Sequence, residues 1–207
     1  MDGASDGGEM ATERARAAAW FTELRDMICA AFERLEDEQT SGPHAGLPAG
    51  RFERKETRRA GEGEGDQGGG VRSVMRGGRG FEKVGGNVSE VFGTLGAQAQ
   101  RSLSARKELP GLADDPRFWA SGISLVAHMN SPKVPAVHMN TRMFWTPSCW
   151  WFGGGTDLNP MMPVDEDTAF FHDVLERACT PHGADYYGRY KAWADDYFML
   201  RHWNEAR

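Results

Sequence analysis

Residues 134–160 read "VPAVHMNTRMFWTPSCWWFGGGTDLNP", and our interpretation of the fold starts from this stretch. Polar and apolar side chains alternate over its first half. His138, Asn140 and Arg142 fall on one face of an expected strand, and the residues between them, including Thr141, fall on the other. An aromatic run, three glycines and Asp157 follow, and we expect a flexible loop there.

These residues allow two interpretations. An arginine fork suits a carboxylate or phosphate, and an imidazole can move a proton near neutral pH, so the strand could bind a ligand. Polar alternation is also what any half-exposed strand shows when one face meets water. The glycines could let the backbone approach a ligand beside an aromatic wall, or they could form only a hairpin loop. Their spacing matches neither a P-loop nor a dinucleotide-binding fingerprint.

The neighbouring sequence extends this strand into a sheet. Residues 121–145 predict two strands joined by the turn "SPKVP", with Ser124, Val126 and His128 on one face of the first strand. Upstream, the pieces "RFERKETR", "VRSVMR" and "GFEKVGG" predict an antiparallel meander. The segment "AGEGEGDQGGG" between them predicts a flexible loop.

Helices are expected at both ends of the chain. Residues 1–10 are typical of a disordered tail, and apolar residues then recur at helical spacing from about Thr12 to Leu35. Near the other end, "EDTAFFHDVLERAC" and "ADYYGRYKAWADDYFMLRHWNEAR" predict two more helices. The last helix is expected to run to Arg207 without a C-cap, from which we expect the sequence to be cut short there.

Composition narrows the class of protein. The chain has 207 residues, a net charge of −6 and a pI near 5.5, so a nucleic-acid partner is not expected. No apolar run is long enough to span a membrane, and the N-terminus lacks a secretory signal. Three scattered cysteines fit reduced thiols, so we expect a cytoplasmic protein.

Four histidines remain as candidate metal ligands. They are His128, His138, His172 and His202, two on expected strands and two on expected helices. Their spacings match no compact metal motif, so separate surface or core histidines are the more ordinary interpretation, with a shared site as the alternative.

The order of the longer motifs resembles a known family. "GISLVAH", "VPAVHMNTR", "WWFGGGTDLNP" and "YKAWADDYFMLRHWNEAR" resemble successive signatures of oxygen-dependent coproporphyrinogen III oxidase. "GFEKVGGNVSEVFG" resembles its FEK-x-G-V-N segment, with Gly86 where valine is usual. The resemblance runs from about Arg14 to Arg207. It implies that residues 11–207 are the N-terminal two-thirds of a single domain with an α+β fold. That fold is a large, flat antiparallel sheet flanked by helices on both faces, incomplete in this chain.

The resemblance also implies a reaction. Such enzymes remove two propionate carboxyls of coproporphyrinogen III as carbon dioxide and leave vinyl groups, giving protoporphyrinogen IX in haem biosynthesis. Molecular oxygen is the co-substrate, no flavin or nicotinamide is used, and the family members are homodimers. The alternative is that this chain is an inactive fragment, or a non-catalytic remnant that binds a tetrapyrrole.

The resemblance assigns roles to individual residues. It implies that His138 is a general acid/base, that Asp157 holds or deprotonates pyrrole nitrogens, and that Arg142 pairs with a propionate. The positions that it implies for substrate contact are Ser124, Asn140, Thr141 and Arg142. The positions that it implies as divalent-metal ligands in bacterial members are His128, His138, His172 and His202.

Overall fold

The computed structural model describes residues 5–59, 66–105, 109 and 111–204. It divides into two compact units. The first comprises Met1–Ser131 and Ala136–Leu158, and the second comprises Pro132–Pro135 and Asn159–Arg207. Each unit is described by itself below.

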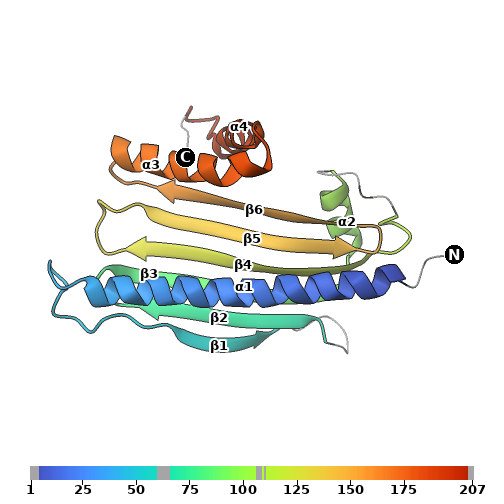
Figure 1. Ribbon diagram of the computed structural model, residues 1–207, viewed down its shortest axis with the longest axis horizontal. Helices are drawn as coiled ribbons and strands as arrows, with labels where there is room; N and C mark the ends of the chain where they lie inside the picture. The colour runs from blue at the N-terminus through green and yellow to red at the C-terminus, as the bar shows by residue number, and fades with distance from the viewer. Residues whose placement is uncertain (1–4, 60–65, 106–108, 110, 205–207) are drawn as a thin grey trace. The chain divides into compact units, whose positions relative to one another are not determined.

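The first unit is built on a six-stranded sheet in which strands follow one another in chain order, β1 to β6 (Figure 1). The strands are β1 (Glu53–Arg58), β2 (Gly68–Arg76), β3 (Phe81–Thr94), β4 (Arg117–Met129), β5 (Ala136–Thr146) and β6 (Cys149–Asn159). The pairs from β1 to β5 are all antiparallel. The α+β class and the antiparallel meander predicted from the sequence are therefore confirmed.

One long helix, α1 (Ser5–Glu38), lies along the middle strands of this sheet (Figure 1). Its buried residues Ala17 and Phe21 form a core cluster with Trp119, Ile123 and Met143 of the sheet. Burying one such side chain stabilises the fold by about 1.5–3 kcal/mol, so the apolar stripe of α1 is what holds the helix on the sheet. We call this side of the sheet the α1 face.

The second half of α1 packs on another core cluster, which includes Met75, Val84 and Leu125. Phe32 of α1 meets Phe81 edge to face, with ring centroids 4.9 Å apart. Two successive clusters under one helix explain why α1 stays regular over 34 residues.

The carboxylate of Glu36, fully buried near the end of α1, joins the helix to two other segments. Its two oxygens accept hydrogen bonds from four backbone N–H groups, at distances of 2.6–2.9 Å. The donors are Gly50, Arg79, Gly80 and Phe81. Burial alone would raise the pKa of Glu36, but these donors outweigh it and the pKa is lowered.

The turn that Glu36 holds also supports β4. The side-chain amide of Asn130, just after β4, donates to the carbonyl oxygens of Gly78 and Arg79 at 2.9 and 3.1 Å. The end of β4 is thus tied to the β2–β3 turn, and that turn is tied to α1.

A third core cluster lies at the far end of the strands. It contains Leu95, Leu109 and Leu112, against which Phe118 and Trp151 pack. A short helix, α2 (Ala97–Ser104), follows β3 in this region and was not predicted from the sequence. With eight residues it is too short for helical periodicity to be read in its side chains.

The second unit consists of α3 (Asp165–Cys179), the short 3₁₀ helix η1 (Thr180–His182) and α4 (Tyr186–Phe198). The hydroxyl of Tyr187 on α4 lies 3.0 Å from Nδ1 of His172 on α3. The helix expected to continue to Arg207 ends instead at Phe198, because Met199 takes an extended conformation. His202 therefore lies beyond the helix, and residues 205–207 lie outside the described part.

Two further expectations need correction. Helix α1 begins at Ser5, so residues 5–10 are helical where a tail was expected, and Met10 packs against the first core cluster. Residues 1–4 lie outside the described part. The glycine-rich stretch after the aromatic run is strand β6 and not a loop, because its backbone pairs with β5. A side chain at Gly154 would collide with the carbonyl oxygen of Asn140, so the close pairing of these strands requires glycine.

The flexible loop expected at "AGEGEGDQGGG" is only partly described by the structure, and its last residues form a strand. Gly68 to Gly70 open strand β2, and residues 60–65 lie outside the described part. Within the described residues, no helix combines the length and the hydropathy needed to cross a membrane.

Candidate active site

The polar residues singled out in the sequence lie on the sheet face opposite the α1 face, which we call the polar face. Directly paired residues of antiparallel strands share a face. On this face Ser124 pairs with Asn140, and Gly122 pairs with Arg142. The intervening residues of β4 are buried toward α1, so the alternation predicted for the strands is confirmed.

His138 and Asp157 form a direct pair. Nδ1 of His138 on β5 lies 3.0 Å from a carboxylate oxygen of Asp157 on β6. The backbone carbonyl of His138 also accepts a hydrogen bond from the Thr156 hydroxyl, at 3.1 Å. A carboxylate at Nδ1 orients the ring and leaves Nε2 as the nitrogen that can exchange a proton with a ligand.

His128 lies next to this pair. The rings of His128 and His138 are 6.1 Å apart between centroids and nearly perpendicular. Val126 pairs directly with His138, and His128 lies two residues further along β4 on the same face.

Arg142 and Asn140 form a second polar pair. A guanidinium nitrogen of Arg142 donates to the side-chain oxygen of Asn140 at 2.8 Å. The guanidinium of Arg142 lies over Gly153 of β6, where an added Cβ would be 3.8 Å away, in ordinary van der Waals contact. Asn140 steadies the fork, and the remaining N–H groups of Arg142 can receive a carboxylate.

Beside these pairs the polar face carries small residues on the neighbouring strands. Gly85 on β3 and Gly155 on β6 face open space, since an added Cβ would meet nothing within 4 Å. Gly122 is different, because its Cβ would lie 2.7 Å from Cβ of Arg142. With Ala120 and Ser124 beside them, these residues form a floor that a flat molecule could approach.

Stacked aromatic rings bound the floor at one end. The rings of Phe118 and Phe144 are 5.7 Å apart with planes 11° apart, and those of Phe144 and Trp151 are 4.9 Å apart. They give the floor an apolar wall beside its polar groups.

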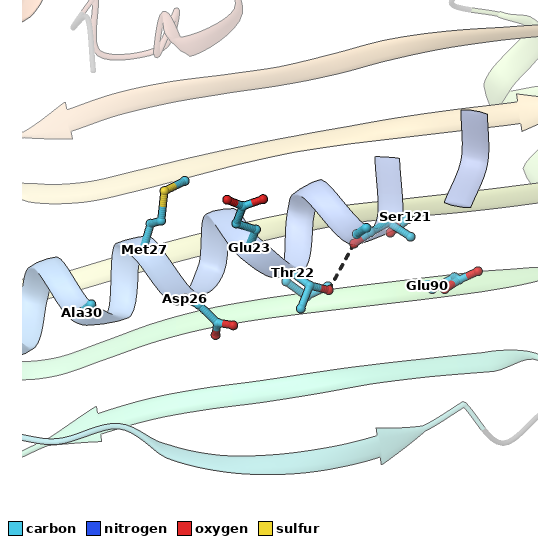
Figure 2. Close-up of a pocket in the computed structure, with 10 residues that line it drawn as sticks. Thr22, Glu23, Asp26, Met27, Ala30, Glu90 and Ser121 are labelled. Atoms are coloured by element: carbon cyan, nitrogen blue, oxygen red, sulfur yellow. Dashed lines mark hydrogen bonds between the residues drawn. The ribbon is translucent and has the colours of Figure 1, made fainter. Parts of the chain in front are cut away.

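An open groove of about 740 Å³ lies on the α1 face, beside the helix (Figure 2). Its lining residues are Ala18, Ala19, Thr22, Glu23, Asp26, Met27, Ala30, Val88, Glu90 and Ser121. The Thr22 hydroxyl is already bonded within the helix, to the carbonyl of Ala18 at 3.1 Å. The carboxylates of Glu23 and Glu90 would repel an anionic ligand, whereas the polar face offers Arg142.

The structure does not bring the four candidate metal ligands together within one unit. His128 and His138 belong to the first unit, and His172 and His202 belong to the second. In neither unit do the described residues form a group of three or more His, Cys, Asp and Glu side chains that could hold a metal ion. Nδ1 of His138 and Nδ1 of His172 already face Asp157 and Tyr187.

One predicted contact residue points elsewhere. Thr141 pairs with buried Ile123, so its side chain belongs to the α1 face and only its backbone lies near the polar face. The sequence singled out His138 and Asp157 separately, but it did not predict that their side chains would be in contact. Nineteen residues separate the two, and only the pairing of β5 with β6 brings them together.

Comparison with known proteins shows the family to which the chain belongs. A family model described as coproporphyrinogen III oxidase matches residues 16–207. Proteins named oxygen-dependent coproporphyrinogen-III oxidase are 46% identical in Rickettsia bellii over 190 residues and 44% identical in Rickettsia peacockii over 192 residues. Each match covers 92% of this chain and 63% of the relative, so the chain spans less than two-thirds of the relatives' length.

Proposed function

We propose, because the chain belongs to the coproporphyrinogen III oxidase family, that its polar face binds coproporphyrinogen III for oxygen-dependent oxidative decarboxylation. The single observation that supports this most directly is the pairing of His138 with Asp157, next to the Asn140–Arg142 pair on an open floor of small residues. The substrate is a flat, apolar ring with carboxylate arms and pyrrole N–H groups, and each of these features has a counterpart on the polar face.

The proposed chemistry removes carbon dioxide and one hydrogen, with its electron pair, from each of two propionate arms. A vinyl group remains on the ring, and molecular oxygen accepts the electrons. The names of the relatives describe them as oxygen-dependent. In this proposal Arg142 binds a propionate, and Asp157 holds pyrrole nitrogens and orients His138. His138 then moves a proton through Nε2.

The experiment that tests the proposal is an assay with coproporphyrinogen III in air and under strict anaerobiosis. We expect conversion to protoporphyrinogen IX and release of carbon dioxide only in air. The conversion is measured by the fluorescence of the oxidised product. Equal turnover without oxygen would contradict the proposal. Tight binding of the tetrapyrrole without any turnover would favour the alternative of a non-catalytic binding protein.

Arg142→Lys tests the propionate contact. Lysine keeps the charge but loses the bidentate geometry and the bond to Asn140. Losing one charge-assisted pair costs about 1.5–3 kcal/mol, so kcat/KM should fall by roughly one to two orders of magnitude. A kcat/KM within about twofold of wild type would mean that Arg142 is only a solvated strand residue.

Gly85→Ala tests the floor, with Gly86→Ala as its matched control. Gly85 faces open space on the polar face, so its new methyl group would stand where the ring lies. The Cβ of residue 86 points instead toward the α1 face, 3.8 Å from Sγ of Cys29. We expect Gly85→Ala to weaken binding of coproporphyrin III, the stable oxidised ring, without lowering Tm. Gly86→Ala should leave the affinity unchanged, and equal affinities in the two variants would place the ring elsewhere.

Metal stays outside the proposed steps, because neither unit by itself supplies a complete ligand set among its described residues. The family resemblance predicts a divalent ion bound by His128, His138, His172 and His202. Elemental analysis of the purified protein tests this, since imidazole suits several such ions. Retained metal that disappears in the variant combining His172→Ala with His202→Ala would support the predicted ligands. A metal-free wild-type protein with full activity would refute them. The predicted homodimer can be tested by size-exclusion chromatography.

A further inference from the structure

Several basic residues on the polar face have no role in the function proposed above. Lys55 on β1, which pairs with Arg72, is one of them, and three others lie on strands nearer the candidate site. Arg72 and Arg76 on β2 and Lys83 on β3 are all exposed, and their neighbours Ser73, Met75 and Val84 are buried toward α1. The two basic strand positions Arg76 and Lys83 pair directly. We call Arg72, Arg76 and Lys83 the basic edge.

The strand register connects the basic edge to the candidate site in two rows. In the first row Arg72 pairs with Asn87, Asn87 pairs with Ser124, and Ser124 pairs with Asn140. Because paired residues share a face, Arg72 and Asn140 flank the same floor, three strand spacings or about 14 Å apart.

In the second row Lys83 pairs with His128. The basic edge therefore ends beside the His128–His138 ring contact, while Arg142 lies on the other side of the floor. Gly85 and Gly122 lie between the two sides, together with the side chains of Asn87, Ser124 and Val126.

The charges of the basic edge are available to a ligand. Among the described residues, none forms an ion pair or hydrogen bond with the side chains of Arg72, Arg76 or Lys83. Many other cations in the described parts of the chain are paired, such as Arg54 with Asp26 on the α1 face and Arg117 with Asp115. Glu53 of β1 pairs with Val74 and shares this face, but the cations Lys55, Arg72, Arg76 and Lys83 outnumber it. On a chain with net charge −6 this positive excess is a local feature, and it attracts anions that approach the face.

We propose that the basic edge is a second carboxylate subsite. It binds the carboxylate arms of the tetrapyrrole that do not react, while a reacting arm lies at Arg142 and His138. This inference rests on the proposed function. A ring held at one edge only could rotate on a flat floor, whereas cations on two opposite sides fix which arm meets His138.

The test compares two oxidised porphyrins that differ in the number of carboxylate arms. Coproporphyrin III carries four propionates and deuteroporphyrin IX carries two. Binding is measured by quenching of tryptophan fluorescence, at low and at high salt. The variant combines Arg72→Met with Lys83→Met, and the control is Arg58→Met. Arg58 is an exposed cation of the same sheet that alternates onto the α1 side of β1 and has no described ion pair.

We expect the double variant to bind coproporphyrin III about fivefold or more weakly, with a smaller salt dependence, because exposed charge pairs contribute modestly and are screened by salt. Its affinity for deuteroporphyrin IX should stay near that of wild type, and Arg58→Met should change neither affinity. Coproporphyrin III affinity within twofold of wild type, or an equal loss for both porphyrins, would overturn the subsite. Failure of the wild-type protein to bind either porphyrin would instead overturn the proposed function, and the subsite with it.

Discussion

Replacing His138 with glutamine is expected to lower kcat for coproporphyrinogen III by about 10²–10⁴-fold, the usual contribution of a positioned general acid or base. Glutamine is polar and of similar length, so the strand and its pairing with β4 should persist. It cannot take up and release a proton near neutral pH. Because Nδ1 of His138 already faces Asp157, the loss should fall on the step served by Nε2.

A second variant tests the protonation state of His138 while keeping a polar side chain beside its ring. Asp157→Asn keeps a polar partner next to Nδ1 of His138, but it can reverse which ring nitrogen carries the proton. We expect kcat to fall in this variant too, while coproporphyrin III still binds to both variants. Steady-state kinetics and fluorescence titration on the same preparations measure the two effects. A wild-type kcat in His138→Gln would show that His138 takes no part in the reaction. Loss of ring binding together with kcat would indicate that His138 has a binding role instead.

Replacing Glu36 with alanine is expected to lower the free energy of unfolding by at least about 3 kcal/mol. The buried carboxylate accepts hydrogen bonds from four backbone N–H groups, and each buried donor left without a partner costs about 1–3 kcal/mol. That loss is a large part of the margin of about 5–15 kcal/mol that keeps a domain folded. Urea unfolding followed by circular dichroism measures it.

The matched control is Glu38→Ala, two residues further along the same helix. Glu38 is exposed, and its nearest cation, Arg34, lies 4.0 Å away, so a change within about 0.5 kcal/mol is expected. Equal destabilisation by the two variants would show that the helix end, and not the buried carboxylate, is responsible.

The same carboxylate predicts a direction of pH dependence. The pKa of Glu36 is lowered in the folded protein, so its stabilising contribution is complete above the unfolded pKa of about 4.3. The contribution is lost as the pH falls from that value through the lower folded pKa. We expect Glu36→Gln, which cannot titrate, to lose less stability than wild type below about pH 4. Parallel acid unfolding curves for the two proteins would contradict this.

Local patterns in the sequence were sufficient for the class of fold and for part of the site. The alternation of His138, Asn140 and Arg142 assigned them to one strand face, because side chains in any strand alternate with a period of two. The apolar stripe of α1 and the meander of β1 to β3 could be predicted for the same reason. Each depends on the spacing of residues that are neighbours in the chain.

Pairing between neighbouring strands decided the rest, because the contacts across the sheet depend on the register in which the strands pair. The glycines after Trp151 have no strong preference of their own, and pairing with β5 made them a strand that places Asp157 against His138. In the same way, the register of β2, β3 and β4 aligns Arg72 and Lys83 with the candidate site. The sequence alone thus determined which residue types are present and which side of its own strand or helix each one lies on. Backbone hydrogen bonding between the strands set the register, and the register decided which side chains of neighbouring strands lie next to one another.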